Sequence, residues 1–344
     1  MTFTLRPRPL QAAAAGWIAA LALILAGAAA AQAPAPPPAV GYQQLEVADT
    51  QGPPVEVGVW YPTAAPARPD MIGLFPVAMA RNAPVEGHRL ALIVMSHGNG
   101  GVFNGHHDTA EALARAGYVV AALTHTGDNY RDQSRAIDLP NRTRQLRLLT
   151  DFMLTGWRDR GVVDPQRIGA FGFSAGGFTV LAAAGGEPDF ATVRPHCAAR
   201  PGAYDCRLLL RSPALAAALE QAKPHWTHDP RLKALVVAAP ALGFAFGREG
   251  LTHVQVPVQL WKAEADQVLP APDYADAVRR DLPASPEFHI VPNAQHFDFL
   301  SPCSPGFQKV APMLCVERAG FSREAFHEAF NASVVAFFDH HLKP

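Results

Sequence analysis

Continuous apolar runs that alternate with helix-like segments constrain the fold of this chain more than any other feature. Residues 91–97 (ALIVMSH), 167–173 (RIGAFGF) and 234–242 (ALVVAAPAL) are almost uninterrupted apolar stretches. Runs of this kind are typical of strands that are covered on both faces. Segments with apolar residues at helical spacing lie between them. The alternation predicts a mostly parallel central sheet flanked by helices.

The same reading extends over most of the chain. Further strands are predicted at 55–62, 118–123, 256–264 and 287–292, and helices at 105–118, 141–157, 175–184, 272–282 and 323–342. Residues 55–62 alternate apolar and polar side chains, as an edge or half-buried strand does. Two stretches interrupt the pattern. Residues 187–231 are interpreted as a cap-like insertion over the carboxyl edge of the sheet, and residues 301–320 as a second irregular insertion.

Composition excludes several functions. The chain has 344 residues, 49% of them hydrophobic, and a net charge of −1, so it can bury a large core but has no basic excess for nucleic acid. The 14 histidines are scattered without a paired-histidine or CxxC spacing, so we expect no metal site. The adjacent pair His106 and His107 is interpreted as a surface or helix-start feature.

The N-terminal residues resemble a targeting segment. Arg6 and Arg8 precede a stretch from Pro9 to Leu45 that has no charged residue and is apolar and then rich in small residues. This is the pattern of a cleaved signal peptide over residues 1–33, with cleavage after residue 30, 31 or 33, and an uncleaved anchor is the alternative. A Pro-rich leader at 34–40 and one domain at 41–344 would follow. We expect an exported protein, periplasmic or secreted, without stable membrane insertion after cleavage.

If the protein is exported, its four cysteines can form disulfide bonds. An oxidising compartment allows three pairings of Cys197, Cys206, Cys303 and Cys315, and four buried thiols are the alternative. We expect the local pairs, 197 with 206 and 303 with 315. A bridge that closes a loop of roughly 10–13 residues contributes on the order of 3 kcal/mol.

One serine lies in the strongest functional motif. Gly172-Phe173-Ser174-Ala175-Gly176 matches G-x-S-x-G between a predicted strand and a predicted helix, which is the context that this motif requires. The serine sits on a sharp, strained turn, so the residues two before and two after it must lack side chains. Its hydroxyl is then exposed at a helix N-terminus. A chance glycine–serine turn is the alternative to a nucleophile.

A serine nucleophile needs a base, and the base needs an orienting carboxylate. Asp266 and His296 each follow a predicted strand, in the chain order Ser, Asp, His that a doubly wound sheet expects. Glu264 and Asp298 are rival acids, and His289, inside its predicted strand, is interpreted as a packing residue.

Two backbone N–H groups should bind the negative oxygen that develops during attack on a carbonyl. One is assigned to Ala175, the residue after the serine. The other is assigned to Asn99 in the glycine-rich loop SHGNGG, residues 96–101. His97 follows the strand directly and is interpreted as a brace of this loop.

With these parts together, the chain resembles the α/β-hydrolase superfamily, and within it the dienelactone-hydrolase-like group that includes the platelet-activating-factor acetylhydrolases. The matching stretches are SHGNGG, VDPQRIGAFGFSAGG, PVQLWKAEADQVLP and NAQHFDFL, and the likeness runs from roughly Gly41 to the C-terminus. The resemblance implies a Ser174–His296–Asp266 triad, no cofactor, and hydrolysis of carboxylic esters. Dienelactone hydrolases proper use a cysteine nucleophile, and many relatives have histidine where this chain has Phe173.

The predicted function is therefore that of an exported serine esterase for small to medium acyl esters, acting through an acyl-enzyme. A serine peptidase or amidase of the same fold is the second hypothesis, and an inactive exported binding protein is the third. Oligomeric state is left open. Aromatic residues near the predicted sheet edge are candidates for the substrate pocket, with core packing as the alternative: Phe173, Phe244, Phe246, Trp261 and Phe297.

Overall fold

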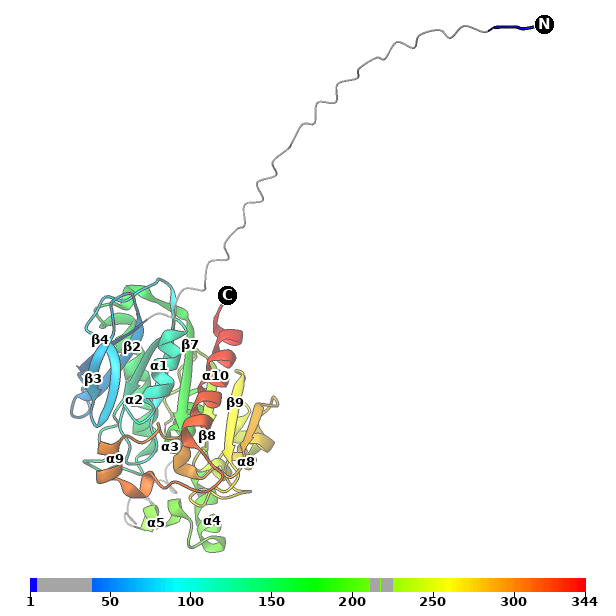
Figure 1. Ribbon diagram of the computed structural model, residues 1–344. Helices are drawn as coiled ribbons and strands as arrows, with labels where there is room; N and C mark the ends of the chain where they lie inside the picture. Colours follow the sequence, from blue (N-terminus) through cyan, green and yellow to red (C-terminus); the bar gives the residue numbers. More distant parts are fainter. Residues whose placement is uncertain (5–38, 211–216, 218–224) are drawn as a thin grey trace. The chain divides into compact units, whose positions relative to one another are not determined.

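A mixed sheet forms the centre of the protein. The structure is a computed structural model that describes residues 1–4, 39–210, 217 and 225–344. Within these residues ten strands lie in the order β10-β9-β8-β7-β5-β6-β2-β1-β4-β3 (Figure 1). The strands are β1 Ala39–Val47, β2 Val55–Thr63, β3 Arg68–Ile72, β4 Phe75–Arg81, β5 Leu90–Ser96, β6 Val119–Leu123, β7 Val163–Phe173, β8 Leu232–Ala238, β9 Val258–Ala263 and β10 Glu287–Val291.

The predicted parallel sheet is confirmed, and one edge differs from the prediction. From β6 through β5, β7, β8 and β9 to β10, every neighbouring pair is parallel. β2 pairs antiparallel with β6, and β1 pairs antiparallel with β2. The expectation of an edge or half-buried strand at 55–62 is wrong, because β2 pairs with a strand on each side and all but one of its residues are buried. The hairpin of β3 and β4 extends the sheet beyond β1.

Helices cover both faces of the sheet. The α-helices are α1 His107–Arg115, α2 Leu139–Thr155, α3 Ala175–Ala183, α4 Val193–Ala199, α5 Tyr204–Leu210, α7 Gly247–Leu251, α8 Ala275–Asp281, α9 Pro305–Val310 and α10 Arg323–Leu342. Short 3-10 turns are η1 Arg160–Val162, η2 Phe190–Thr192, η3 Gly243–Ala245, η4 His296–Phe299 and η5 Pro312–Leu314. The predicted helices at 105–118, 141–157, 175–184, 272–282 and 323–342 correspond to α1, α2, α3, α8 and α10.

The continuous apolar runs are explained by two separate cores. Along β5, Leu92 and Val94 point to a core shared with α2 and α3, whereas Ile93 and Met95 point to a core shared with α1 and α10. α1 and α10 lie on one face in Figure 1. A strand with an apolar core on each side cannot alternate polar and apolar residues, because neither face meets water.

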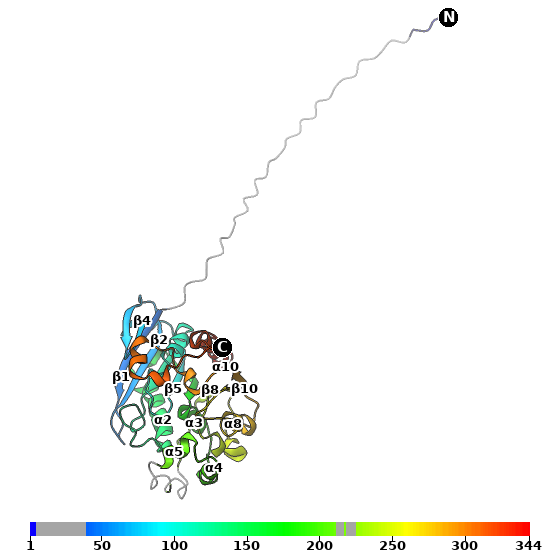
Figure 2. The same cartoon turned by 60° about the horizontal axis from the view of Figure 1, so that its bottom comes forward.

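The parallel strands deliver their carboxyl ends to one edge. β7 leads directly into α3, and Ser174 lies at that junction. Both views show the short helices α4 and α5 beyond this end, on the side of α3 (Figure 2). They belong to the stretch 187–231 that was interpreted as a cap, of which 211–216 and 218–224 lie outside the described residues.

The N-terminal predictions fall mostly outside the described residues. The signal peptide at 1–33 and the leader at 34–40 overlap residues 5–38, which are not described. Ala39 and Val40 belong to β1, so the ordered domain begins two residues before the predicted boundary at 41. In the described part of the chain, no helix combines the length and the apolar character that crossing a membrane requires.

Four histidines are buried beside the central strands. His106 and His107 are not on the surface; both are buried, and α1 starts at His107. The His106 ring packs against the rings of Phe171 and Phe173, and burial lowers its pKa to about 4. Burial and the charge of Arg142 hold the pKa values of His97 and His125 well below the ordinary range.

These histidines predict acid lability. A histidine whose pKa is lowered in the folded state takes up its proton only in the unfolded state, so stability is complete above about pH 6.5 and falls as pH drops toward 4. Each group contributes a slope of about 1.4 kcal/mol per pH unit in that window. Urea unfolding between pH 8 and pH 5 measures the slope. The variant His106→Phe should reduce the slope by about 1.4 kcal/mol per pH unit, which is the contribution of one proton. The control His88→Phe, at an exposed site, should leave the slope unchanged. Equal slopes in all three proteins would contradict this account.

Candidate active site

Ser174 occupies a strained turn between β7 and α3. Its backbone has φ 56° and ψ −118°, a left-handed conformation that costs a non-glycine residue on the order of 1–3 kcal/mol. Backbone hydrogen bonds hold it there. The Ser174 N–H donates to the Ala238 carbonyl over 2.9 Å, and the Ser174 carbonyl accepts from the N–H groups of Phe178 and Ala241. Strain of this kind persists only where the surroundings impose it.

The two glycines of the motif are required by backbone contacts. A Cβ added to Gly172 would lie 2.1 Å from the Gly176 carbonyl oxygen, and one added to Gly176 would lie 1.9 Å from the Ser96 carbonyl oxygen. Neither backbone can move away, because each belongs to the central sheet or to α3. The start of α3 is therefore pressed against the ends of β7 and β5, as the steric reading of the motif expects.

The structure brings His296 and Asp266 to Ser174. His296 Nε2 lies 3.0 Å from Ser174 Oγ, and His296 Nδ1 lies 2.8 Å from Asp266 Oδ2. Asp266 follows β9, and His296 follows β10 as the first residue of η4. An ionised carboxylate only accepts hydrogen bonds, so Nδ1 carries the imidazole proton and Nε2 is free to accept from the serine hydroxyl.

The surroundings of Asp266 favour its ionised form. Its Oδ1 accepts the N–H groups of Val268 and Leu269 over 2.9 and 2.7 Å. Burial opposes ionisation, but the facing His296 ring and these donors outweigh it and lower the pKa of Asp266. The rival acids lie elsewhere: Glu264 accepts the N–H of Asn293, and Asp298 pairs with two arginines.

The loop after β5 carries the second candidate oxyanion donor. The Gly101 N–H donates to the Gly98 carbonyl, which folds residues 98–101 into a turn. The Asn99 side chain is fixed at both ends, since its amide donates to Asp128 over 2.6 Å and its carbonyl accepts from Tyr204 over 2.5 Å. His97 braces this loop: its Nε2 accepts the His125 N–H, and its Nδ1–H donates to the Gly98 carbonyl. Asn99, Ala175 and Ser174 all line one pocket.

That pocket is apolar and adjoins the serine. Its space, counted together with the solvent at its open mouth, is about 560 Å³. Asp205, whose pKa burial raises, contributes a carboxyl group that accepts from the Tyr274 hydroxyl over 3.1 Å. The remaining lining is largely aliphatic or aromatic: Ala136, Ile137, Leu139, Phe190, Tyr204, Leu208, Leu209, Ala241, Leu242 and Leu269.

None of the aromatic residues proposed for the substrate pocket is among the residues that line this pocket. Phe173 is buried behind the serine, with its ring centroid 4.8 Å from that of His296. The ring of Phe244 stacks on His196, and that of Trp261 stacks on His289. Phe246 packs on Phe178 in the core, and Phe297 lies beside His296. Helix α5 and the segment 136–139 supply much of the pocket wall instead.

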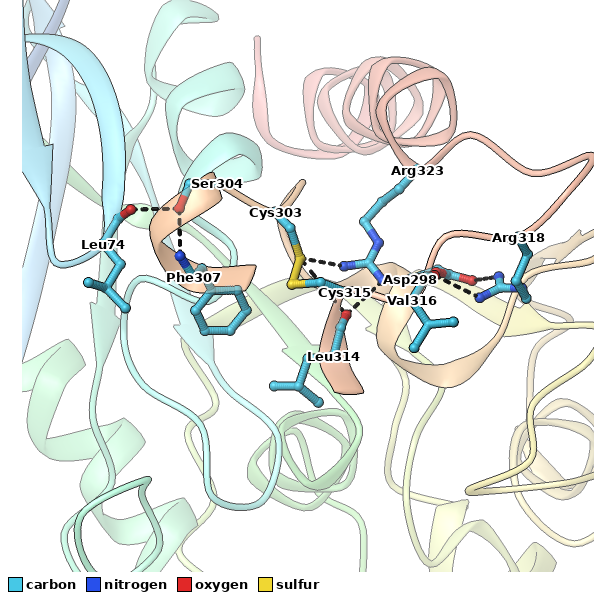
Figure 3. The surroundings of a disulfide bond; sticks show 10 residues. All are labelled: Leu74, Asp298, Cys303, Ser304, Phe307, Leu314, Cys315, Val316, Arg318 and Arg323. Carbon is cyan, nitrogen blue, oxygen red and sulfur yellow. Dashed lines mark hydrogen bonds and ion pairs between the residues drawn. A yellow bond between two sulfur atoms is a disulfide. The ribbon is translucent and has the colours of Figure 1, made fainter. Parts of the chain in front are cut away.

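A disulfide-closed loop supports the turn that carries His296. Asp298 Oδ2 accepts the Gln295 N–H over 2.7 Å and caps η4 directly before His296. Arg318 and Arg323 both pair with Asp298 (Figure 3). Arg323 also donates to the Leu314 carbonyl and to Cys303 Sγ, so the Cys303–Cys315 bridge and the histidine turn share one guanidinium.

Both expected disulfides are present, Cys197–Cys206 and Cys303–Cys315. The first joins α4 to α5, and the second closes the insertion that contains α9. A cluster with ligand-like spacing, His196, Asp205 and Cys206, offers two metal ligands at most, because the Cys206 sulfur is already bonded to Cys197.

Sequence reasoning missed the polar residues beneath the loop. Asp128 and Arg142 form a buried ion pair at 2.5 Å, and Tyr204 reaches Asn99 from α5. The position of Arg142 in the sequence could have predicted this buried ion pair. Arg142 lies four residues before Leu146, on the same buried stripe of α2 as Leu149 and Met153, and a charge on a core-facing stripe needs a buried partner.

Comparison with known proteins agrees with this architecture. A family model described as the prolyl oligopeptidase family matches residues 106–198, a segment that contains Ser174 and ends before Asp266 and His296. Among solved structures, the ferulic acid esterase from Streptomyces cinnamoneus superposes with a TM-score of 0.61 at 21% identity, over 91% of this chain and 92% of that chain. No curated protein sequence matches. The fold is that of the α/β-hydrolase superfamily.

The glycine contacts generate a stability prediction. The variant Gly172→Ala forces a Cβ into the Gly176 backbone, and overpacking of this kind costs about 1–3 kcal/mol or more. We expect a clear drop in the urea midpoint. The control is Gly161→Ala in η1, where an added Cβ meets nothing within 4 Å. Its free energy of unfolding should change by less than about 0.5 kcal/mol. Similar midpoints for the two variants would show that the turn is not tightly packed.

Proposed function

We propose that this protein is a serine hydrolase that cleaves carboxylic esters with Ser174, His296 and Asp266. The observation that carries the proposal is the continuous chain from Ser174 Oγ through His296 to Asp266, at 3.0 and 2.8 Å, beside an apolar pocket. A hydroxyl, an imidazole and an ionised carboxylate in this order are the parts of a nucleophile that a base activates.

The first half of the reaction follows from the tautomer of His296. Its Nε2 takes the proton of Ser174 as Oγ attacks the ester carbonyl, which gives a tetrahedral intermediate and an imidazolium. Asp266 is ionised and fully engaged by hydrogen bonds, so it stabilises that cation without taking the proton.

Donors around Ser174 stabilise the negative oxygen of this tetrahedral intermediate. The N–H of Ala175, at the first position of α3, and the N–H of Asn99 would receive the negative oxygen. His296 then gives its proton to the departing alcohol, which leaves an acyl-enzyme at Ser174. Water then attacks the acyl carbonyl while His296 takes its proton, and His296 returns that proton to Ser174 Oγ as the acyl group leaves as a carboxylic acid.

The pocket supports esters with a small or medium apolar acyl group. Its lining presents aliphatic side chains and one carboxyl, Asp205, and this suits an uncharged acyl chain better than an anionic one. The fold neighbour named as a ferulic acid esterase makes hydroxycinnamoyl esters a sensible second series to test. The Asp205 carboxyl can accept a hydrogen bond from a hydroxyl on such an acyl group.

A peptidase or amidase is the second candidate, because the matching family model is that of prolyl oligopeptidases. The same three side chains serve either leaving group. Matched p-nitrophenyl ester and p-nitroanilide substrates with one acyl group separate the two, since a peptidase should retain substantial anilide activity.

We infer export as well. The charged-then-apolar N-terminal sequence and the two local disulfides support it, because such bridges persist in oxidising compartments. The substrate would then be met outside the cytoplasm.

The nucleophile assignment is tested with p-nitrophenyl esters from acetate to decanoate. We expect chain-length-dependent hydrolysis by the unmodified protein and a fall of about 10⁴-fold or more in kcat for Ser174→Ala. The control Ser134→Ala changes an exposed loop serine and should match the unmodified protein. A fluorophosphonate should label the control and not Ser174→Ala. Hydrolysis that survives in Ser174→Ala would assign the chemistry to another residue, and an unmodified protein that neither hydrolyses nor labels would favour a binding protein.

The two disulfides should affect different kinetic constants. The Cys303–Cys315 bridge shares Arg323 with the His296 turn, so Cys303→Ser/Cys315→Ser should lower kcat. The Cys197–Cys206 bridge holds α5, which lines the pocket, so Cys197→Ser/Cys206→Ser should mainly raise KM and change chain-length preference. Each loss should also cost on the order of 2–4 kcal/mol of stability. Steady-state kinetics well below both unfolding midpoints provide the measurement, and identical kinetic effects of the two pairs would contradict the assignment.

A further inference from the structure

A charged side chain lies fully buried beneath the candidate oxyanion site. Arg142 is on the core-facing stripe of α2, and its side chain and that of Asp128 are 2% and 1% exposed. Arg142 donates to four acceptors with its three nitrogens: Nη1 to Asp128 Oδ2 at 2.5 Å, Nε to Thr179 Oγ1 at 3.0 Å, and Nη2 to both the His97 carbonyl and Ser96 Oγ. The acceptors come from the end of β5, the loop after β6, and α3.

One branch of this network reaches Asn99. Asp128 uses its second oxygen, Oδ1, to accept from the Asn99 side-chain amide at 2.6 Å and from the Gly100 N–H at 2.9 Å. Arg142 holds the His97 carbonyl at the other end of the same loop. The loop from 97 to 100 is thus held at both ends by one ion pair.

The other branch reaches Ala175. Thr179 Oγ1, which accepts from Arg142 Nε, donates its own hydrogen to the Ala175 carbonyl at 2.7 Å. A single bridging side chain therefore connects Arg142 to each of the two residues that carry the candidate oxyanion donors, although those two residues are far apart in the sequence.

Stability does not account for such a pair. Replacing a buried ion pair with uncharged groups of similar volume is often neutral or stabilising, because the pair must first lose its water. An oxyanion hole, in contrast, depends on donors held before the negative charge appears. The rigid fork of a guanidinium suits several fixed acceptors at once, whereas a lysine ammonium offers a single flexible point.

We propose that Arg142 and Asp128 are positioning residues that set the spacing of the Asn99 and Ala175 N–H groups. The inference rests on the proposed ester hydrolysis at Ser174. Neither residue touches the substrate. Arg142 fixes the loop through Asp128 and fixes the start of α3 through Thr179. The positions of both donors therefore depend on one guanidinium.

The test removes both charges together and compares a matched pair on the same helix. Arg142→Met/Asp128→Asn keeps side-chain volume and leaves no unpaired charge. The control is Arg144→Met/Asp49→Asn, which removes a bidentate ion pair at 2.6 and 2.8 Å that has no contact with the loop. Circular dichroism and urea unfolding establish that each protein is folded. Kinetics are measured with p-nitrophenyl esters, and binding with a trifluoromethyl ketone, which forms a tetrahedral adduct at a serine.

We expect the Arg142 and Asp128 variant to lose about 10²-fold in kcat, the loss typical of one oxyanion donor. KM should change by less than about threefold, because the pocket is intact. The inhibition constant for the ketone should rise by the same factor as kcat/KM falls, since both report the tetrahedral state. The acidic limb of the pH profile should stay in place, because Ser174, His296 and Asp266 are unchanged. Arg142→Lys, which keeps the charge and loses the fork, should show most of the same loss.

Other outcomes decide against the inference. A folded Arg142→Met/Asp128→Asn protein with the kcat and ketone affinity of the control would overturn it. So would a loss of active sites, measured by fluorophosphonate titration, with normal kinetics in the remainder. If that variant does not fold, Thr179→Val cuts only the branch to Ala175 and should lower kcat and ketone affinity by about tenfold. Unchanged constants in Thr179→Val would then refute the proposal. An unmodified protein that hydrolyses no ester and is not labelled would instead refute the proposed function.

Discussion

The close approach of three backbones at the start of α3 is the constraint on which the rest of the site depends. Gly172 and Gly176 leave no space for a Cβ between the end of β7, the end of β5 and the first turn of α3. This contact holds Ser174 at φ 56° and brings the loop after β5 to the same place as the start of α3. The backbone contact alone therefore places the serine close to the backbone N–H groups of the loop and of α3. The strain is sustained because the sheet fixes both flanking strands.

Burial and neighbouring groups fix the charge state of the titratable side chains around this contact. His97, His106 and His125 are held neutral by burial, and for His97 and His125 the charge of Arg142 adds to the effect. Asp266 is kept ionised on the other side of Ser174. The only proton acceptor placed against the serine hydroxyl by the described residues is therefore His296, with its free Nε2. The neutral rings of His97 and His125 form hydrogen bonds, so they can brace the loop without competing as bases.

The sequence predicts the central fold well because its signals are local. Buried parallel strands appear in the sequence as continuous apolar runs, and the G-x-S-x-G turn appears as glycines at fixed positions. These signals predict β5, β7 and α3. β1, β3 and β4 were not predicted. β3 and β4 contain Pro69 and Pro76 and lie at the sheet edge, where prolines are tolerated and the apolar period is weak. The pocket was missed for a different reason: its wall comes from α5, whose position is set by a disulfide and by the contact of Tyr204 with Asn99 rather than by any periodicity.

The two insertions divide the remaining tasks between them. The parallel strands end at one edge and can place the nucleophile, the acid and the base, but a sheet edge by itself offers neither a pocket wall nor a support for the turn that carries His296. The segment with Cys197 and Cys206 supplies the wall through α5, and the segment with Cys303 and Cys315 supports the turn through Arg323 and Asp298 (Figure 3). In the described residues both segments contain only short helices and turns, too little to form a core of their own, and each is closed by a bridge. Changes in the first segment can then alter what enters the pocket while the second keeps the geometry of His296 constant.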